Sequence, residues 1–342
     1  MLKLKTNTKF DIIGMGEVML RLSPPDKETI SQSDIFIKTA GGSELNVVSG
    51  AAMLGARGGM ITKLPYSKTG RFIRNRIRYG NVSDDFILFD KSCKSRLGIY
   101  YYEAGAYPRK SAVLYDRENS AMCSLKFSEI PQSVFALAKI FHVSSITMAL
   151  SASMKKTVIE TVKEFRSNGA KISFDVNYRA ALWSEDDARK AVEEILPFVD
   201  FLFVSEETSR RMMKRTGSLE SIMEGFAKEY GCELIATTKR EVISPNRHNF
   251  TSVILHGETF YEEKPYTDIE VIDRVGSGDA YVAGVLYGLL ESCDPIRSLK
   301  VGNALSALKN TVVGDMSVFS LDEIEKVIAS HCEIGVQSEM DR

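Results

Sequence analysis

The sequence lacks a long hydrophobic run and an excess of charge of either sign. Its longest apolar stretch, Ala280 to Leu290, has about half of the ~20 residues that a membrane-spanning helix needs. Its 44 lysines and arginines balance 45 aspartates and glutamates, which argues against partners such as duplex nucleic acid or an anionic membrane surface. The hydrophobic fraction of 44% is ordinary for a globular protein and too high for a disordered one.

Cysteine pairs and a secretory pattern are also missing. The five cysteines lie far apart and form no CxxC motif, which is typical of reduced thiols in a chain of this length. Asp11 and Glu17 interrupt the apolar run near the N-terminus, whereas a signal peptide needs it unbroken. We therefore expect a cytoplasmic protein.

Several common cofactor motifs are absent. The chain has no GxxxxGK[ST] phosphate loop, no HExxH zinc motif and no GxSxG elbow. Gly14 and Gly16 follow a predicted strand, but Met19 stands where a dinucleotide fingerprint has its third glycine. A nicotinamide dehydrogenase is therefore a remote alternative. The four histidines are scattered, and we expect no metal site built from side chains.

Short apolar runs alternate with helical patterns along the 342 residues. This alternation predicts an α/β fold, with a parallel sheet between helices on both faces. We predict strands over 10–20, 58–64, 139–146, 171–177, 201–205 and 233–238, a hairpin over 253–261, and helices over 154–167, 184–196, 219–229, 278–291, 294–310 and 321–331.

Residues 96–117 break the alternation, because they are typical of a strand, a turn and a second strand, with a high density of tyrosine. A hairpin inserted into a parallel α/β domain does not readily join the main sheet. We favour a small separate sheet that acts as a lid, and an edge extension of the core is the alternative.

Two glycine-containing motifs remain. Asp273-Arg274-Val275-Gly276-Ser277-Gly278-Asp279 precedes an apolar helix, so its backbone N–H groups are suited to an anion such as phosphate. Asp279 would repel that anion, and it makes more sense as a base that accepts a proton from a hydroxyl. The alternative is a structural turn in which Asp279 only favours the helix dipole.

The second motif is Gly41-Gly42-Ser43-Glu44-Leu45-Asn46, which leads into a helix rich in small residues. Gly41 and Gly42 allow a ligand to approach the backbone, and Asn46 can donate and accept hydrogen bonds. A close-packed turn and helix would explain most of this pattern equally well.

Together and in this order, the two motifs resemble those of the ribokinase-like (PfkB-type) sugar kinases, over nearly the whole chain. Further matches are similar to the 2-keto-3-deoxygluconate kinases within that family, among them 15–25, 97–100, 115–117, 175–179, 306–309 and 314–315. The resemblance implies one ribokinase-like domain over 1–342, with a small β lid contributed by about 17–40 and 95–118.

The implied activity is transfer of phosphate from ATP to 2-keto-3-deoxygluconate, which gives 2-keto-3-deoxy-6-phosphogluconate. Asp279 would be the general base, and Gly276, Ser277 and Gly278 would stabilise charge on the transferring phosphoryl group. Mg²⁺ would arrive with the nucleotide, and the family often also responds to a monovalent cation. Lids in this family often pair between subunits, so we expect a homo-oligomer.

The resemblance also implies a set of substrate contacts. Arg117 and Arg179 occupy positions that bind a sugar acid, and arginine pairs with carboxylates through two parallel hydrogen bonds. Tyr100 and Tyr115 would form a wall beside the sugar, while Gly41, Gly42 and Asn46 would hold its hydroxyl end. Without the resemblance, capping and lid packing would be the simpler readings of these side chains.

The nucleotide region departs from the family pattern at two places. An N-x-x-E element is replaced by Ser205-Glu206-Glu207-Thr208, and the usual glycine-rich turn is absent from 239–243. We select Ser205, Thr238 and Asn303 as nucleotide contacts. Two alternatives stay open: a ribokinase-like kinase for a neutral sugar such as fructose, and a non-catalytic relative that binds sugar or nucleotide.

Overall fold

The computed structural model describes residues 3–244 and 246–332, which are built around an eleven-stranded sheet. Its strands are β1 (Phe10–Met15), β4 (Gly58–Pro65), β5 (Val82–Ser83), β6 (Ile87–Asp90), β9 (Ala138–Ser144), β10 (Lys171–Asp175), β11 (Phe201–Phe203), β12 (Leu234–Ser244), β13 (Arg247–His256), β14 (Thr259–Glu262) and β15 (Tyr266–Glu270). The order is β14-β13-β12-β11-β10-β9-β1-β4-β5. From β12 to β5 the neighbours are parallel, which confirms the predicted class.

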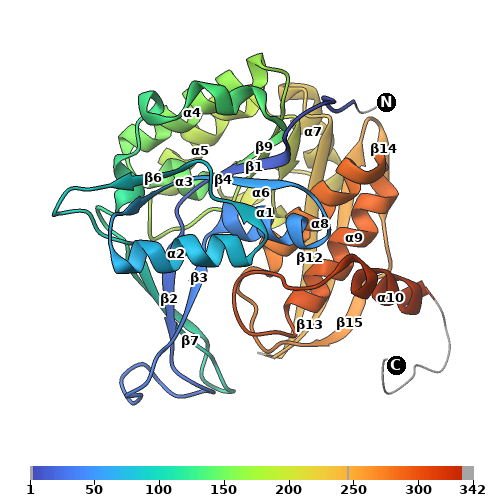
Figure 1. Cartoon of the computed structure of the whole chain (residues 1–342). Helices are drawn as coiled ribbons and strands as arrows, with labels where there is room; N and C mark the ends of the chain where they lie inside the picture. Colours follow the sequence, from blue (N-terminus) through green and yellow to red (C-terminus); the bar gives the residue numbers. More distant parts are fainter. Residues whose placement is uncertain (1–2, 245, 333–342) are drawn as a thin grey trace.

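Helices cover both faces of this sheet (Figure 1). One face carries α3 (Ser145–Ala149), α4 (Ala152–Ser167), α5 (Glu185–Ile195), α6 (Glu206–Arg211) and α7 (Leu219–Tyr230). The other carries α1 (Ser43–Met53), α2 (Lys68–Tyr79), α8 (Ser277–Ser292), α9 (Pro295–Lys309) and α10 (Leu321–Cys332). Short 3-10 turns lie at Ala121–Ser124, Phe127–Glu129, Gln132–Ala136 and Leu196–Phe198.

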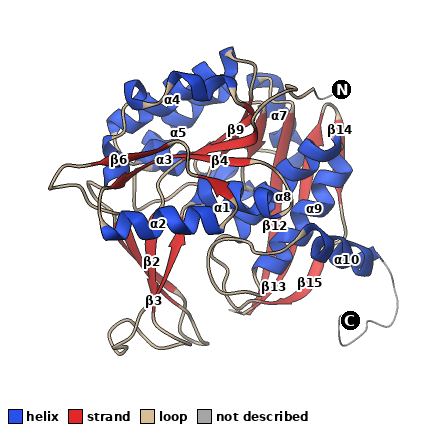
Figure 2. Cartoon of the chain, viewed as in Figure 1, coloured by secondary structure: helices blue, strands red, loops and turns tan. Residues whose placement is uncertain are grey.

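The strands supply both hydrophobic cores by alternation. In β11, Leu202 faces the core under α4, α5 and α7, whereas Phe201 and Phe203 face the core under α1, α8 and α9. Successive side chains of a strand point to opposite faces, so a strand that is buried on both sides is apolar throughout. Figure 2 shows α4 and α2 on opposite sides of the strands β4 and β6.

A second sheet stands apart from the first. It contains β2 (Met19–Ser23), β3 (Ile37–Gly41), β7 (Ile99–Glu103) and β8 (Ala112–Asp116), in the order β3-β2-β7-β8. It projects from the body at the lower left of Figure 1. The predicted hairpin is therefore part of a separate small sheet, and the edge extension of the core is wrong.

Several predicted strands have different bounds: those expected over 139–146, 171–177 and 201–205 end two residues earlier, and two others differ in arrangement. The strand expected over 10–20 is two strands, because the chain leaves the main sheet after Met15 and enters the small sheet at Met19. Between them, a Cβ atom on Gly16 would lie 2.1 Å from Glu44 Oε2, so Gly16 allows helix α1 to pack closely at the crossing. The strand expected to end at 238 continues to Ser244 and forms a long hairpin with β13.

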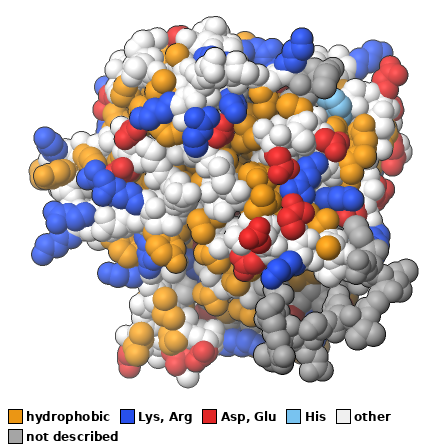
Figure 3. Space-filling model, turned by 45° about the vertical axis from the view of Figure 1, so that its right-hand side comes forward, with side chains coloured by type: hydrophobic (Ala, Val, Ile, Leu, Met, Phe, Trp, Pro, Cys, Tyr) orange, Lys and Arg blue, Asp and Glu red, His pale blue; other side chains and the backbone are white. Residues whose placement is uncertain are grey.

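The surface carries charges of both signs. Figure 3 shows acidic and basic side chains interspersed on the face that α9 and α10 cover. Arg297 of α9 pairs there with Glu291 and Glu325, as the balanced composition leads one to expect. Within the described ranges, no helix has both the length and the apolarity to cross a bilayer.

Helices α8 and α9 pack at backbone distance, and this contact depends on glycine. A Cβ atom on Gly288 would lie 2.5 Å from the Cα atom of Ser298, and one on Gly284 would lie 2.7 Å from the Cα atom of Gly302. A Cβ atom on Gly50 of α1 would lie 2.8 Å from the Cβ atom of Ala283 in α8. Helices α1, α8 and α9 therefore pack closely against one another, and the N-termini of α1 and α8 face the same cavity.

We expect Gly288→Ala to lower the free energy of unfolding by about 1–3 kcal/mol, because the new methyl group overlaps the α9 backbone. Gly225→Ala is the matched control, since Gly225 lies in α7 with open space around its Cβ position. For Gly225→Ala we expect the free energy of unfolding to rise by about 0.4–1 kcal/mol. Urea unfolding measures this free energy for both variants, and equal changes in the two would contradict the packing argument.

Candidate active site

A cavity of about 1010 Å³ opens at the carboxyl ends of the parallel strands. Its walls come from the ends of β10 and β11, from β12, from β7 and β8 of the small sheet, and from the N-termini of α1 and α8. Ligands of open parallel sheets bind at this edge. The volume is large enough for two small molecules side by side.

Helices α1 and α8 meet the cavity with uncapped N-termini. Of helices α1 to α9, all of which the structure describes, these two begin at glycines, Gly42 and Gly276, without a side-chain cap. The others are capped by Ser67, Ser144, Ser151, Ser184, Ser205, Ser218 and Asp294. The first N–H groups of α8 are therefore available to an anion.

The turn before α8 requires glycine at one position. Gly276 has φ +83°, and a Cβ atom there would lie 2.0 Å from the carbonyl oxygen of Asp315. Gly278 has open space around its Cβ position, and Ser277 N–H bonds back to the carbonyl of Arg274 at 3.2 Å. The turn thus rests on the segment around Asp315 and presents its other side to the cavity.

Asp279 lies in the first turn of α8 and is 8% exposed. Its Oδ1 atom accepts from Ser43 Oγ at 2.8 Å, and its Oδ2 atom accepts from Asn46 Nδ2 at 2.7 Å. Asn177 Nδ2 donates to the same serine at 3.1 Å. Burial raises the pKa of Asp279, although these bonds and the charge of Arg179 oppose the shift. A carboxylate with a raised pKa is a better proton acceptor.

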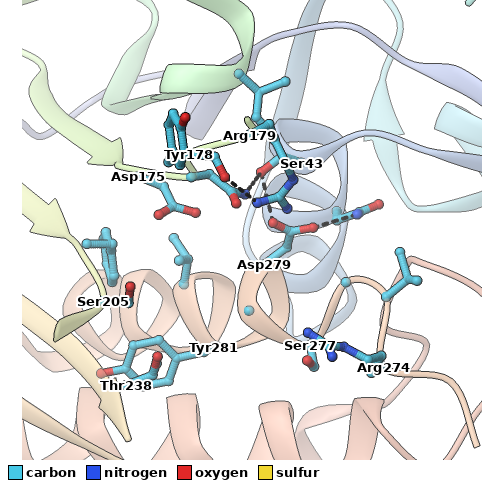
Figure 4. Close-up of a pocket in the computed structure, with 18 of the residues that line it drawn as sticks. Ser43, Asp175, Tyr178, Arg179, Ser205, Thr238, Arg274, Ser277, Asp279 and Tyr281 are labelled. Atoms are coloured by element: carbon cyan, nitrogen blue, oxygen red, sulfur yellow. Dashed lines mark hydrogen bonds between the residues drawn. The ribbon is translucent and has the colours of Figure 1, made fainter. Parts of the chain in front are cut away.

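A second carboxyl group, Asp175 at the end of β10, faces the same part of the cavity (Figure 4). Burial, and then the charge of Asp279, raise the pKa of Asp175 to about 8. Arg179 lowers it and Glu44 raises it further. Asp175 is therefore protonated at neutral pH, so it adds no negative charge beside Asp279.

The two predicted carboxylate-binding arginines have different surroundings. Arg179 is exposed and donates to the carbonyl of Tyr178 at 3.1 Å, and no carboxylate of the described chain forms an ion pair with it. Arg117 is buried and its Nε donates to Glu17 Oε2 at 2.8 Å, with a further bond from Nη2. Both arginines line the cavity.

The predicted sugar-facing residues are only partly at the cavity wall. Gly42, Asn46, Tyr100 and Tyr115 line it, and the rings of the two tyrosines lie 5.9 Å apart. The Tyr100 hydroxyl donates to Asp315 Oδ2. Gly41 lies behind this wall, where a Cβ atom would be 2.1 Å from the same oxygen. Asn46 contacts Asp279, so its amide orients that carboxylate.

A group of basic residues in the cavity wall was not predicted. Arg240 of β12, His248 of β13 and Arg274 all line the cavity. Burial and the charge of Arg274 lower the pKa of Arg240, and burial and both arginines lower that of His248. These groups repel one another, and a bound polyanion would relieve the repulsion. Arg274 was visible within the glycine motif, but only the fold brings it to Arg240.

The three predicted nucleotide contacts are not brought together. Thr238 and Ser205 line the cavity, but the Ser205 hydroxyl caps α6, where it accepts from Thr208 N at 3.1 Å and donates to Thr208 Oγ1 at 2.8 Å. Asn303 is fully buried, bonded to Ser252 and Glu263, and outside the cavity wall. A helix pattern places a residue on a face, but not beside a particular cavity.

One buried ion-pair network supports the site. Arg21 of β2 donates from Nη2 to Asp273 Oδ2 at 2.6 Å and from Nη1 to Asp315 Oδ1 at 2.7 Å. Asp273 also accepts from Gly314 N at 3.0 Å. The small sheet, the glycine turn and the segment after α9 therefore meet at one guanidinium. In the described part of the chain, no group of three or more His, Cys, Asp or Glu side chains is placed to hold a metal ion.

The raised pKa of Asp175 makes stability depend on pH. Its folded-state pKa of about 8 exceeds the model-compound value of 3.8, so the folded state loses stability relative to the unfolded chain as pH rises between these values. Asp175→Asn removes this loss, and we expect its gain in Tm to grow from pH 5 to pH 8. Asp186→Asn, at an exposed position of α5, is the control and should show no such trend. A gain independent of pH would contradict a protonated Asp175.

Comparison with known proteins gives consistent results. Residues 9–321 match the profile of the pfkB family carbohydrate kinases. The chain is 33% identical over 318 residues to the 2-dehydro-3-deoxygalactonokinase of Haloferax volcanii, covering 93% of this chain and 96% of that relative. It is 27% identical to the 2-dehydro-3-deoxygluconokinase of Bacillus subtilis, covering 90% and 92% of the two chains.

A solved structure agrees. The 2-dehydro-3-deoxygluconokinase of Thermotoga maritima superposes with a TM-score of 0.90 at 32% identity, over 94% of this chain and 98% of that one. The resemblance inferred from the motifs at 41–46 and 273–279 is therefore confirmed. The chain belongs to the pfkB family of carbohydrate kinases.

Proposed function

We propose that this protein transfers the γ-phosphoryl group of ATP to the 6-hydroxyl of 2-keto-3-deoxygluconate (2-dehydro-3-deoxygluconate), forming 2-keto-3-deoxy-6-phosphogluconate and ADP. The observation that carries the proposal is a buried Asp279 at the uncapped N-terminus of α8, in the same cavity as the unpaired Arg179. Relatives that cover nearly the whole chain are named as kinases of 2-dehydro-3-deoxy sugar acids.

Asp279 is the general base in this proposal. The sugar hydroxyl oxygen attacks the γ-phosphorus while the bond to the ADP oxygen breaks, and the hydroxyl proton passes to the Asp279 carboxylate. The hydrogen bonds from Ser43 and Asn46 hold both carboxylate oxygens in position. The N–H groups of Gly276 and Gly278 stabilise charge on the transferring group, and Ser277, whose own N–H bonds to the carbonyl of Arg274, holds the turn between them in place.

The acidic end of the sugar is bound by arginine. Within the described chain no carboxylate forms an ion pair with Arg179, although its charge acts on Asp175 and Asp279. Its guanidinium can therefore form two parallel hydrogen bonds with the substrate. Arg117 uses its Nε and one N–H of Nη2 on Glu17, so three of its five N–H groups remain for a ligand. Tyr100 and Tyr115 form the wall beside the sugar, and the start of α1 at Gly42 and Asn46 faces its hydroxyl end. The two glycines Gly41 and Gly42 make room for the protein itself: a Cβ atom on Gly42 would lie 2.3 Å from the carbonyl oxygen of Glu17, and Gly41 makes room for the Tyr100–Asp315 pair behind that wall.

The nucleotide occupies the part of the cavity that the basic residues Arg240, His248 and Arg274 line. Arg240 follows Thr238 by two positions on β12, and Arg274 lines the same cavity. The mutual repulsion of the two arginines favours binding of the triphosphate. Arg240 itself lies within the glycine-free stretch 239–243, so this stretch faces the triphosphate with positive charge in place of a glycine-rich turn. Mg²⁺ would arrive with the nucleotide, held mostly by phosphate oxygens and water, and would supply positive charge beside the phosphoryl group.

The small sheet acts as a lid on a single domain, and we place the protein in the cytoplasm. The lid also pairs two copies of the chain in this proposal. Its edge strand β8 exposes Val113, Leu114 and Tyr115 by 41%, 56% and 43%. An exposed apolar edge strand is a site for pairing with another strand, and a second copy offers the same edge.

The function is tested by ATP consumption with a panel of acceptors: 2-keto-3-deoxygluconate, its galactonate epimer, gluconate, fructose and ribose. We expect turnover of the 2-keto-3-deoxy acids, and a loss of about 10²- to 10⁴-fold in kcat for Asp279→Asn with little change in KM. Turnover of neutral sugars alone would favour the fructokinase alternative. Sugar or nucleotide binding without turnover of any acceptor would favour a non-catalytic relative.

Recognition of the carboxylate makes a separate prediction. Arg179→Ala should raise KM for the sugar acid by about 10- to 100-fold, because a charge-assisted hydrogen-bonded pair is lost, while KM for ATP changes little. Arg179→Lys keeps the charge and should recover part of the affinity. Arg78→Ala, on the surface of α2, is the control. An unchanged KM for the sugar acid in Arg179→Ala would contradict the proposal that Arg179 binds the substrate carboxylate.

A further inference from the structure

Lys309, the last residue of α9, is fully buried. Among the residues that the structure describes, it is the one lysine below the surface. A lysine is almost never buried in full unless its charge is compensated. The burial of the Lys309 ammonium therefore requires compensating interactions.

The Lys309 ammonium is held by backbone carbonyls. Its Nζ atom donates to the carbonyl of Asp273 at 3.1 Å and to the carbonyl of Val312 at 3.3 Å. Asp273 begins the glycine turn that presents N–H groups to the cavity, and Val312 lies in the segment on which that turn rests. The ammonium thus joins the two backbone segments whose contact sets the position of the turn.

The charges around Lys309 favour its protonated form, although burial opposes it. Burial lowers the pKa of Lys309, while Asp273, Asp315 and Asp279 raise it and Arg21 lowers it. Three buried carboxyl groups thus lie near two buried cations, Arg21 and Lys309. An ammonium ion bound to carbonyl oxygens has the environment that carbonyl oxygens give to a small monovalent cation such as K⁺.

We propose that Lys309 is a built-in cation that positions the Gly276–Gly278 turn for phosphoryl transfer, in place of a bound monovalent ion. The inference rests on the proposed kinase function for its kinetic consequences. Lys309 touches neither substrate in this arrangement, so it is a positioning residue that acts through the carbonyl of Asp273. Ser306 assists from one turn earlier, where its hydroxyl donates to the carbonyl of Ser277 at 3.0 Å.

The proposal makes the wild-type rate independent of monovalent cations. Phosphoryl transfer by the wild-type enzyme should be the same in Na⁺, K⁺ and tetramethylammonium chloride at equal ionic strength. Lys309→Met keeps an unbranched side chain, one atom shorter, and removes the charged group. We expect it to lower kcat by about 10- to 100-fold through displacement of the turn, with little change in KM for the sugar acid. Lys300→Met, at a partly exposed position of α9, is the matched control.

Lys309→Ala leaves space for a small ion and allows chemical rescue. Ammonium or K⁺ should raise its Tm and restore part of its kcat, whereas tetramethylammonium, which is too large for the space, should not. The rise in Tm is measured without ATP or sugar, so it can succeed or fail independently of the proposed function.

Three results would overturn the proposal: activation of the wild type by K⁺, an unchanged kcat in Lys309→Met, or no response of Lys309→Ala to any small cation. If both variants unfold and no cation restores them, Lys309 has a structural role alone and the proposal is also wrong. Refolding of Lys309→Ala by ammonium would support it.

Discussion

The guanidinium of Arg21 is the contact on which the geometry of the site depends. It lies on β2 of the small sheet, stacks 4.3 Å from the centre of the Tyr102 ring, and pairs with Asp273 and Asp315. Removing one partner of such a buried pair leaves an uncompensated charge, which costs about 3–5 kcal/mol. The glycine turn, the segment after α9 and the small sheet therefore keep their relative positions together or lose them together.

The cavity wall carries charges of both signs. The two carboxyl groups of Asp175 and Asp279 have raised pKa values, so their negative charge is smaller than the residue types suggest. Arg240 and Arg274 line the same cavity and repel each other without an ion-pair partner in the described chain. Two anionic substrates can therefore bind in one cavity, although the protein as a whole is almost neutral.

Local patterns predicted the features that depend on local interactions. The helices expected over 184–196 and 219–229 span Glu185–Ile195 and Leu219–Tyr230, and the turn at 276–279 faces the cavity. Contacts between residues far apart in the chain were not predicted, because no spacing indicates that Arg21 meets Asp315 or that Arg240 meets Arg274. Asn303 was expected on a helix and lies on α9, but its amide forms hydrogen bonds with Ser252 and Glu263 inside the core and does not reach the cavity.

The Arg21–Asp315 pair joins residues separated by 294 positions, and this has a consequence for synthesis on the ribosome. At 5–20 residues per second, about 15 to 60 s pass between the emergence of the two partners. During that interval the nascent chain holds an arginine, and later Asp273, without the complete network. The site can therefore form only after Asp315 has been made, so incomplete chains that end before this residue cannot assemble it.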